Sequence, residues 1–558
     1  MSVLHHSGVW VCYILFYVFA RYFTDPTRGT SDFVILGIAI FLWLICLPPV
    51  IEYYSQLAIG QSPELGARYS KYTELANTAV PLVAAWYFRL SGKKAFFAIV
   101  TLVLMSFFSV STKSRSGIIL FQIGILCSGV AAFAFSSLRT YRKKALILVG
   151  TILLVTLFSN VALFVFAVAV PVIERVQDPL MGDSNRLRVL FLHVSKEMFA
   201  HRPLAGVGAD NFGQEYTRFQ ALLAAKDPRY PDLQLTEDRM PERAHNEFAQ
   251  IGAELGIVGL TVFAIFLVGI AFWGIRCLLQ RDATIYQVTA FIGIGVFLLS
   301  SCVTSYSFRT LQNGFMFFLV LAVAVGHSIR PDELAQVAES KPARWYKISL
   351  ALGLIGCAML ATLSVVRVIA VKEIIEAGTQ PDIASSEVLF AKAEATDPEN
   401  ATIQAVIGRS LVLNNQPNDA IPHLRQTIEL GRALTADYSY LATAQILAGQ
   451  KCEAIATLEE GLRVYPLSVF LHTRVGALQN ECGFPEESEA HFKRASEIDP
   501  AQAQTWRYFA ESGGRIASEK AYQLNLPVVM DLKPNSAIYA MKDDRELRFP
   551  GEKLVLPQ

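Results

Sequence analysis

Long apolar runs dominate the first two thirds of the chain. Ten such runs stand at about 8–20, 31–51, 75–90, 95–110, 116–136, 145–170, 250–275, 284–304, 311–329 and 347–368. A helix needs roughly 20 apolar residues to span a bilayer, and most of these runs reach that length, although 8–20 and 75–90 are short. The pattern predicts an all-α fold, a polytopic membrane helix bundle with about ten spans, within limits of 9–12.

A second pattern begins after the last apolar run. Pro398, Pro466 and Pro500 are separated by 68 and 34 residues, and Arg432 occupies the missing proline column. The same 34-residue period aligns a column of small residues and a column of large apolar residues: Gly408, Ala442, Gly476 and Ala510, and Phe390, Leu424, Leu458 and Phe492. This period is typical of tetratricopeptide repeats, helical hairpins that bury their apolar faces only against their neighbours. We expect about three and a half repeats over 384–515, and a cap or tail over 516–558.

Composition supports this division and excludes one function class. Of the 558 residues, 53% are hydrophobic and only 17% are charged, as expected for a membrane protein. A net charge of +1 argues against a nucleic-acid-binding protein. The cysteines of the apolar runs lack metal-ligand spacing, and the first run has neither the flanks nor the cleavage site of a signal peptide. We therefore expect a membrane domain over 1–370.

Basic residues in the short loops predict the orientation. If the long segment 171–249 is outside, the inside loops hold fifteen Lys and Arg residues and the outside loops hold five. Basic loops stay on the cytoplasmic side, so 171–249, Arg115, Arg309 and the repeats share the non-cytoplasmic face. Disulfides can form outside the cytoplasm, and Cys452 and Cys482 stand in adjacent repeats, so a bridge between them is one alternative.

The long loop carries candidate chemistry. The segment 172–247 contains ten basic and twelve acidic residues, so the loop is not a general anion-binding surface. Arg115 opens an apolar run, and Arg186 and Arg188 open an amphipathic stretch on the same side. Guanidinium groups bind phosphate oxygens through paired hydrogen bonds, which favours Arg115 and Arg186 as anion ligands. For Arg188 and Arg309 we favour a role in topology or headgroup contact.

Two glycine motifs follow in the sequence. Gly206 and Gly208 lie in a Pro- and Gly-containing stretch that predicts a tight turn, with phosphate binding by its amides as the weaker alternative. Gly252 and Gly256 form a small-xxx-small pair, which predicts close approach of another helix.

The loop returns to the membrane at His245 and Asn246, which either cap the next helix or meet a substrate. Glu254 would lie ~13.5 Å along the helix from His245, so we interpret it as a supporting or packing residue.

Three elements in this order resemble the O-antigen ligase/polymerase superfamily, which includes bacterial oligosaccharyltransferases that glycosylate proteins. They are Ser114-Arg115-Ser116-Gly117 at the start of an apolar run, Ser184-Asn185-Arg186 leading to the Gly206/Gly208 turn, and His245-Asn246 followed by Glu254, Gly256 and Gly259. Phe248 stands where leucine is commoner in the family. The resemblance covers roughly 75–330.

The resemblance implies an inverting glycosyltransferase in the bacterial inner membrane that acts on its periplasmic face. The donor would be a glycan on undecaprenyl pyrophosphate, and the acceptor a hydroxyl group of a lipid or a protein. His245 would activate the acceptor, while Arg115 and Arg186, with Arg188 in reserve, would stabilise the leaving pyrophosphate. No acidic metal-binding motif is present, so we expect neither a metal nor a cofactor. Tyr306 and Arg309 are further candidates for lining the cavity.

Other interpretations have to be weighed. A transporter of lipid-linked glycans should show polar residues within its spans and inverted repeats, which the sequence does not clearly contain. A membrane-anchored repeat scaffold would need only one or two spans. Within the transferase class we favour a ligase that transfers O-antigen to the lipid A core, with an O-antigen or exopolysaccharide polymerase and a protein O-oligosaccharyltransferase as alternatives. The concave surface of the repeats would bind a protein partner.

Overall fold

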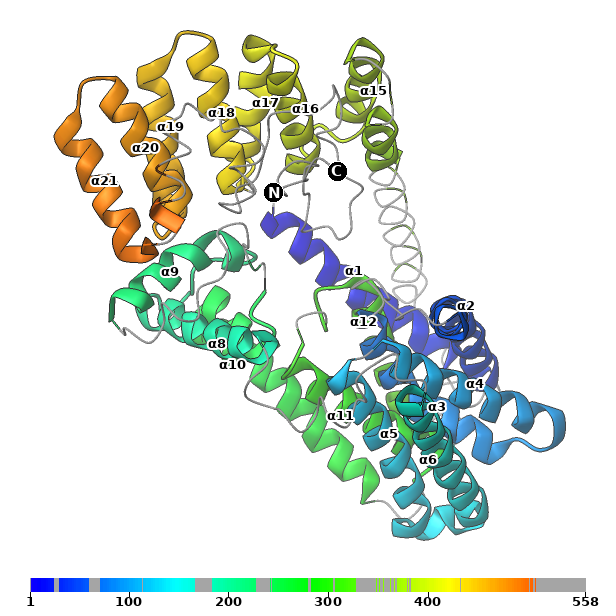
Figure 1. Ribbon diagram of the computed structural model, residues 1–558. Coiled ribbons are helices and arrows are strands. Elements are labelled where there is room, and N and C mark those ends of the chain that lie inside the picture. Colours follow the sequence, from blue (N-terminus) through cyan, green and yellow to red (C-terminus); the bar gives the residue numbers. More distant parts are fainter. Residues whose placement is uncertain are drawn as a thin grey trace. The chain divides into compact units, whose positions relative to one another are not determined.

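The computed structural model describes residues 2–24, 30–59, 71–112, 114–165, 183–226, 241, 243–279, 283–304, 307–327, 369–378, 380, 383–431, 433–500 and 502–504, with single residues at 348, 351, 355, 362, 366 and 507. Within these ranges every regular element is a helix and no strand is present, which confirms the all-α prediction (Figure 1). Contacts divide the chain into two compact units: Met1–Asp210 with Arg243–Met359, and Asn211–Glu242 with Leu360–Gln558. This division differs from the predicted boundary, because part of the long loop belongs to the second unit.

The first unit is a helix bundle. Its helices are α1 (Ser2–Phe23), α2 (Ser31–Ala58), α3 (Lys71–Arg89), α4 (Gly92–Ser111), α5 (Arg115–Ala134), the 3₁₀ helix η3 (Ser136–Tyr141), α6 (Arg142–Val165), α8 (Asp183–His201), α10 (Glu247–Leu278), α11 (Ile285–Ser301) and α12 (Leu311–Gly326). At its centre α3 is buried continuously over 73–88, because α4, α5, α11 and α12 pack around it.

Several of these helices can cross a membrane. Among the described residues α2, α4, α5 and α10 are both long and apolar enough, and shorter apolar helices stand at Val9–Arg21, Ile285–Ser301 and Leu311–Gly326. Along α10 the side chains of Val262, Ile265 and Phe272 are 65–69% exposed. Such a stripe is stable where the surrounding solvent is lipid, so the chain is a multi-pass membrane protein. The count of ten spans stays a prediction, since the last run lies almost wholly outside the described residues.

The second unit contains the helical hairpins that the 34-residue period predicts. Its helices are α15 (Ile383–Thr396), α16 (Ala401–Leu413), α17 (Pro417–Glu429), α18 (Thr435–Leu447), α19 (Lys451–Val464), α20 (Val469–Glu481) and α21 (Pro485–Ile498). The first helices of the hairpins begin at 401, 435 and 469, and the second at 417, 451 and 485, so each series advances by 34. The turn between them repeats too, with a left-handed residue at Asn415, Gly449 and Gly483.

The predicted small and large columns lie against each other in these hairpins. A Cβ added to Gly408 would come within 2.6 Å of Leu424, and one added to Gly476 within 3.2 Å of Phe492. The small residue on the first helix therefore makes room for the large residue on the second. Assignment to the tetratricopeptide family stays a prediction, and the predicted tail at 516–558 lies outside the described residues.

One helix of the long loop belongs to this second unit. α9 (Phe212–Lys226) packs against α19, and the Thr217 hydroxyl donates to the Val464 carbonyl. Its Phe212, Tyr216 and Phe219 are buried, at the spacing of one helical face. The loop is thus shared: α8 belongs to the bundle and α9 to the repeats. Cys452 and Cys482 are free thiols in this unit, so the bridge considered above is not formed.

Candidate functional site

The glycine turn of the loop docks onto α10 where that helix breaks. Gly256 has φ 62° and ψ −157°, which interrupts the α-helical path within α10. Four backbone hydrogen bonds join the turn to the break: Val207 N to Ala253 O at 2.9 Å, Gly208 N to Glu254 O at 2.9 Å, Ile257 N to Pro203 O at 2.7 Å and Val258 N to Leu204 O at 3.3 Å. The turn therefore satisfies donors and acceptors that the break in α10 releases.

Both motifs need glycine for the same reason. Gly206 (φ 67°) and Gly256 adopt left-handed backbone conformations. A Cβ on Gly206 would lie 2.3 Å from the Glu254 carbonyl carbon, and a Cβ on Gly256 would lie 2.4 Å from the Leu204 oxygen. The small-xxx-small prediction was therefore wrong for Gly256, which admits a turn of the loop rather than another helix, whereas a Cβ added to Gly252 would lie 3.7 Å from Phe199 of α8. Gly259 lies one turn further on, where a Cβ would meet Leu255 at 2.2 Å.

The amides of the turn are engaged in holding the fold. Gly206 N donates to Arg202 O at 2.9 Å, and the amides of Val207 and Gly208 donate to α10. These donors already have acceptors, so the geometry supports the structural turn rather than a phosphate cradle.

His245 and Asn246 form the entrance to α10. The Asn246 side chain caps the helix by accepting from Ala249 N at 2.9 Å, and its amide donates to Cys302 O at 2.9 Å. The capping alternative thus holds for Asn246. His245 precedes the helix in a left-handed conformation (φ 52°), which is uncommon for a residue with a side chain. Its half-buried imidazole stacks on Phe191 of α8, with ring centroids 5.5 Å apart and an interplanar angle of 18°.

Arg188 of α8 lies near Arg115 of α5. Arg188 is half-buried; burial lowers its pKa, and the positive charge of Arg115 lowers the pKa further. Arg188 and Phe191 are three residues apart and share one face of α8. That face therefore carries a guanidinium group on which the charge of Arg115 acts, and the ring on which His245 stacks. The prediction that Arg188 serves topology alone does not account for this placement.

Arg186 and Tyr306 cannot be placed in the same way. Arg186 lies in the first turn of α8, but its side chain is outside the described part of the structure, and Tyr306 is outside the described residues altogether. Ser114 caps α5 by accepting from Gly117 N at 3.1 Å, which fixes the helix start at Arg115.

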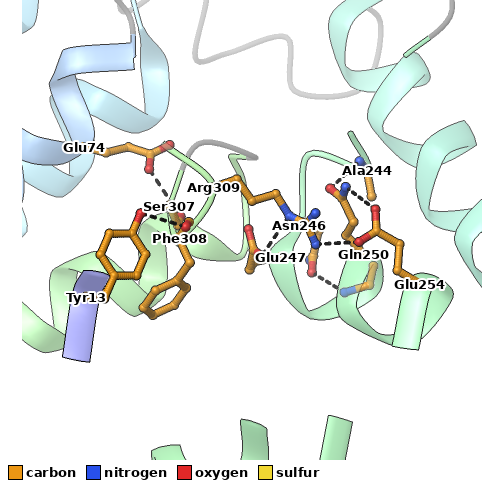
Figure 2. A network of polar contacts seen from close by, with 11 residues as sticks. Tyr13, Glu74, Ala244, Asn246, Glu247, Gln250, Glu254, Ser307, Phe308 and Arg309 are labelled. Carbon is orange, nitrogen blue, oxygen red and sulfur yellow. Dashed lines mark hydrogen bonds and ion pairs between the residues drawn. The ribbon is translucent and has the colours of Figure 1, made fainter. Parts of the chain in front are cut away.

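A buried ion-pair network holds the beginning of α10 (Figure 2). Arg309 donates to Glu247 through Nε at 3.1 Å and to Glu254 through Nη2 at 2.9 Å. Burial would lower the pKa of Arg309, but the two carboxylates more than offset this and raise it above its usual range. The Arg309 side chain is only 9% exposed, so the predicted headgroup role was wrong.

The network reaches the residue before His245. Gln250 donates to Glu254 Oε1 at 2.9 Å, and its own oxygen accepts from Ala244 N at 3.1 Å. Through Gln250, Glu254 is connected to the backbone next to His245. That Glu254 supports the site stays a prediction.

A second buried carboxylate fixes the loop that carries Arg309. Glu74 of α3 accepts from the hydroxyls of Thr304 and Ser307, the latter at 3.2 Å, and from Asn313 Nδ2 at 3.2 Å. The Tyr13 hydroxyl donates to Phe308 O at 3.0 Å on the same loop (Figure 2). The sequence analysis missed Glu74 and Glu247. An acidic residue at the start of an apolar run was the available signal for Glu74, since such residues are costly in membranes.

The arrangement suits transfer to a hydroxyl group with loss of an anionic leaving group. An imidazole fixed by stacking can accept a proton, and guanidinium groups can stabilise phosphate oxygens. Among the described residues no group of three or more His, Cys, Asp or Glu side chains is placed to hold a metal ion.

Comparison with protein families gives one match. Residues 100–264 match the family model Wzy_C, described as O-antigen ligase. The matched segment runs from α4 to the middle of α10 and includes Arg115, Arg186, Arg188 and His245. No curated protein matches the chain.

Proposed function

Because residues 100–264 belong to the O-antigen ligase superfamily, we propose that the chain is a metal-independent, inverting glycosyltransferase of the bacterial inner membrane. Its donor is a glycan linked to undecaprenyl pyrophosphate, and its acceptor is a hydroxyl group presented on the periplasmic face. In this orientation the long loop and the repeats are periplasmic, in accord with the distribution of basic residues.

One observation carries the proposal: α8 brings together the two kinds of group that the reaction needs. Arg188 lies near Arg115, and Phe191 on the same face holds the ring of His245. In the transfer step the acceptor oxygen attacks the anomeric carbon from the face opposite the pyrophosphate. The carbon–oxygen bond to the pyrophosphate breaks, and the acceptor proton passes to His245.

The arginines act on the leaving group. The departing pyrophosphate keeps the electron pair of the broken bond, so its negative charge grows in the transition state. Fixed guanidinium groups stabilise that charge more than the charge of the bound donor, which accelerates the chemical step. We assign this role to Arg115 and Arg188, and to Arg186 through the family resemblance.

The acceptor separates the branches of the family. We favour an O-antigen ligase that uses the lipid A core; the alternatives are a polymerase, which uses a second lipid-linked unit, and a protein oligosaccharyltransferase. The repeats offer a surface for a protein partner or a protein acceptor.

The decisive experiment is reconstitution with undecaprenyl-pyrophosphate oligosaccharide. Lipid A core, a second lipid-linked unit and a pilin-like protein are supplied separately, and product is measured for each. His245→Ala should lower transfer by about 10²–10⁴-fold, because the acceptor loses its base. The matched control is His201→Ala on the same loop, since the His201 side chain is 43% exposed. Full activity of His245→Ala would exclude the proposed role.

The arginine assignment has its own control. Arg188→Gln should slow transfer, whereas Arg218→Gln on α9, at a position 57% exposed, should not. Equal rates in the two variants would remove Arg188 from the pyrophosphate site. Product with one acceptor only would name the branch, and absence of product with all three would favour a transporter.

A further inference from the structure

The backbone at His245 is held on both sides by side chains at the beginning of α10. On one side, the Ala244 amide donates to the side-chain oxygen of Gln250 at 3.1 Å (Figure 2). On the other side, Asn246 caps the helix by accepting from Ala249 N at 2.9 Å. Together these two contacts fix the peptide groups before and after His245.

This anchoring matters because His245 has an unfavourable backbone conformation. Its φ of 52° lies in the left-handed region, which is costly for a residue with a Cβ and persists where surrounding contacts hold it. Ala244 is 1% exposed, so its amide needs an acceptor inside the protein, and Gln250 supplies one. Loss of that acceptor would favour rearrangement of the segment that carries the imidazole.

The Gln250 amide is itself oriented by the buried ion pair. Its nitrogen donates to Glu254 Oε1 at 2.9 Å, and Glu254 Oε2 lies 2.9 Å from Nη2 of Arg309. A carboxylate only accepts hydrogen bonds, so the amide nitrogen faces Glu254 and the amide oxygen faces Ala244. The ion pair thus determines which end of the buried amide the backbone meets.

We propose that Gln250 is a positioning residue for His245. It links the buried ion pair to the backbone at Ala244, and so keeps the imidazole on Phe191 in the orientation that receives the proton of the acceptor. The proton transfer rests on the proposed function, whereas the orientation of the imidazole does not.

The first test replaces the amide by an apolar side chain of similar size. Gln250→Leu should lower kcat of the reconstituted transfer by about 10²-fold, the loss expected from a misplacement of about 1 Å. The donor KM should stay at its wild-type value, because donor binding is assigned to arginines. The matched control is Gln287→Leu, since the side-chain oxygen of buried Gln287 accepts from Thr284 N at 3.4 Å at the start of α11. Equal losses of kcat in the two variants, each eluting as a monodisperse peak, would exclude a specific role of Gln250.

A double variant separates positioning from a general structural role. If Gln250 acts through His245, the residual transfer of His245→Ala has no imidazole left to orient. Adding Gln250→Leu should then cause no further loss of kcat, since residues that act as one unit are not additive. Multiplication of the two losses would show that Gln250 affects the reaction by another route, and the proposal would fail.

Exchange of the amide and the carboxylate provides the rescue. In Gln250→Glu/Glu254→Gln, the carboxylate at position 250 can accept from Ala244 N and from the amide at position 254, whose oxygen can accept from Arg309. The net charge and each of these hydrogen bonds are kept. The exchange should recover most of the kcat lost in Gln250→Leu, whereas Gln250→Glu alone puts two carboxylates side by side and should recover less. An exchange variant as slow as Gln250→Leu would contradict the proposal.

A measurement without substrates follows the imidazole itself. Diethyl pyrocarbonate modifies histidine rings, and mass spectrometry of peptides gives the rate at each histidine of the purified protein. Gln250→Leu should raise the rate at His245, because the ring leaves Phe191, while the 43% exposed His201 serves as an internal reference. Gln287→Leu should match wild type. An unchanged or lower rate at His245 in Gln250→Leu would overturn the proposal.

These measurements distinguish failure of the positioning role from failure of the proposed function. If wild type transfers to no acceptor while Gln250→Leu raises the modification rate of His245, the proposed reaction fails and the positioning role stands. If wild type transfers and His245→Ala does not, but Gln250→Leu changes neither kcat nor the modification rate, the reaction stands and the positioning role fails.

Discussion

The repeats and the cluster around the start of α10 are both held by polar contacts between side chains, but these contacts differ in range. In the repeats, Arg409 binds Asp437 and Arg425 binds Glu460, pairs 28 and 35 residues apart. In the bundle, Glu74 binds Thr304 and Tyr13 binds Phe308, pairs 230 and 295 residues apart. Contacts of about one repeat length join neighbouring hairpins whose register the sequence period sets, whereas contacts of long range are set by the packing of whole helices.

This difference explains what could be predicted. The 34-residue period located the hairpins because each meets its neighbour in the same register, so the columns of Gly408 and Leu424 come into contact. The membrane helices followed from apolar length alone. The candidate roles of Arg115, His245 and Glu254 were predicted from family resemblance and position, and these predictions did not require knowledge of their partners.

The rest could not be predicted from local pattern. The role of Arg309 depends on two glutamates 62 and 55 residues earlier, Glu247 and Glu254, and no periodicity connects them. The sequence does not reveal the break at Gly256, because a glycine with positive φ cannot be distinguished by residue type from a glycine in a helix. The turn that occupies the break lies about 50 residues earlier. Sequence thus indicates which residues are unusual, and packing decides what they touch.

The largest difference in stability is expected when a glycine with positive φ is replaced by alanine in each region. Gly256→Ala should prevent folding or cost more than about 4 kcal/mol, because the new Cβ overlaps the Leu204 carbonyl at 2.4 Å and displaces the docked turn. Gly449→Ala in the repeats, at φ 83° with no atom within 4 Å of the new Cβ, should cost only about 1–2 kcal/mol. Thermal unfolding of both variants in detergent measures this. Equal losses would mean that docking of the turn contributes little.

The next largest loss of stability is expected when the arginine of a buried ion pair is replaced in each region. Arg309→Met leaves two buried carboxylates and should cost about 3–5 kcal/mol. In the repeats, Arg409→Met leaves one, Asp437, which also accepts from Leu434 N at 2.7 Å. Adding Asp437→Asn should therefore restore most of the stability lost in Arg409→Met.

In the bundle, recovery of the lost stability should need more substitutions than in the repeats. Adding Glu254→Gln to Arg309→Met should restore only part of the lost stability, and full recovery should also need Glu247→Gln. Unfolding temperatures of the single, double and triple variants test this stepwise recovery. Full recovery in the first double variant would contradict a network of one cation and two anions.

The smallest effect compares two equivalent positions within the repeats. His472 and Gln404 are separated by 68 residues, twice the period, and their side-chain nitrogens make the same 3.2 Å contact with Pro466 O and Pro398 O. Burial lowers the pKa of His472 from 6.5 to about 4, despite the contact with Pro466, and neighbouring His491 contributes to the lowering. The unfolded chain therefore binds a proton that the folded chain does not, between pH 6.5 and about 4.

Stability of this hairpin should consequently be intact above pH 6.5 and fall as the pH drops towards 4, by on the order of 1–3 kcal/mol. Hydrogen exchange of α20 and α21 amides in the intact protein, compared at pH 7 and pH 4.5 after correction for intrinsic rates, measures the change. His472→Gln introduces the residue that already serves at position 404, so it should reduce the acid sensitivity of α20 while leaving α16 unchanged. If wild type and variant respond identically to acid, burial of the His472 imidazole is not the reason for the acid sensitivity of the hairpin formed by α20 and α21.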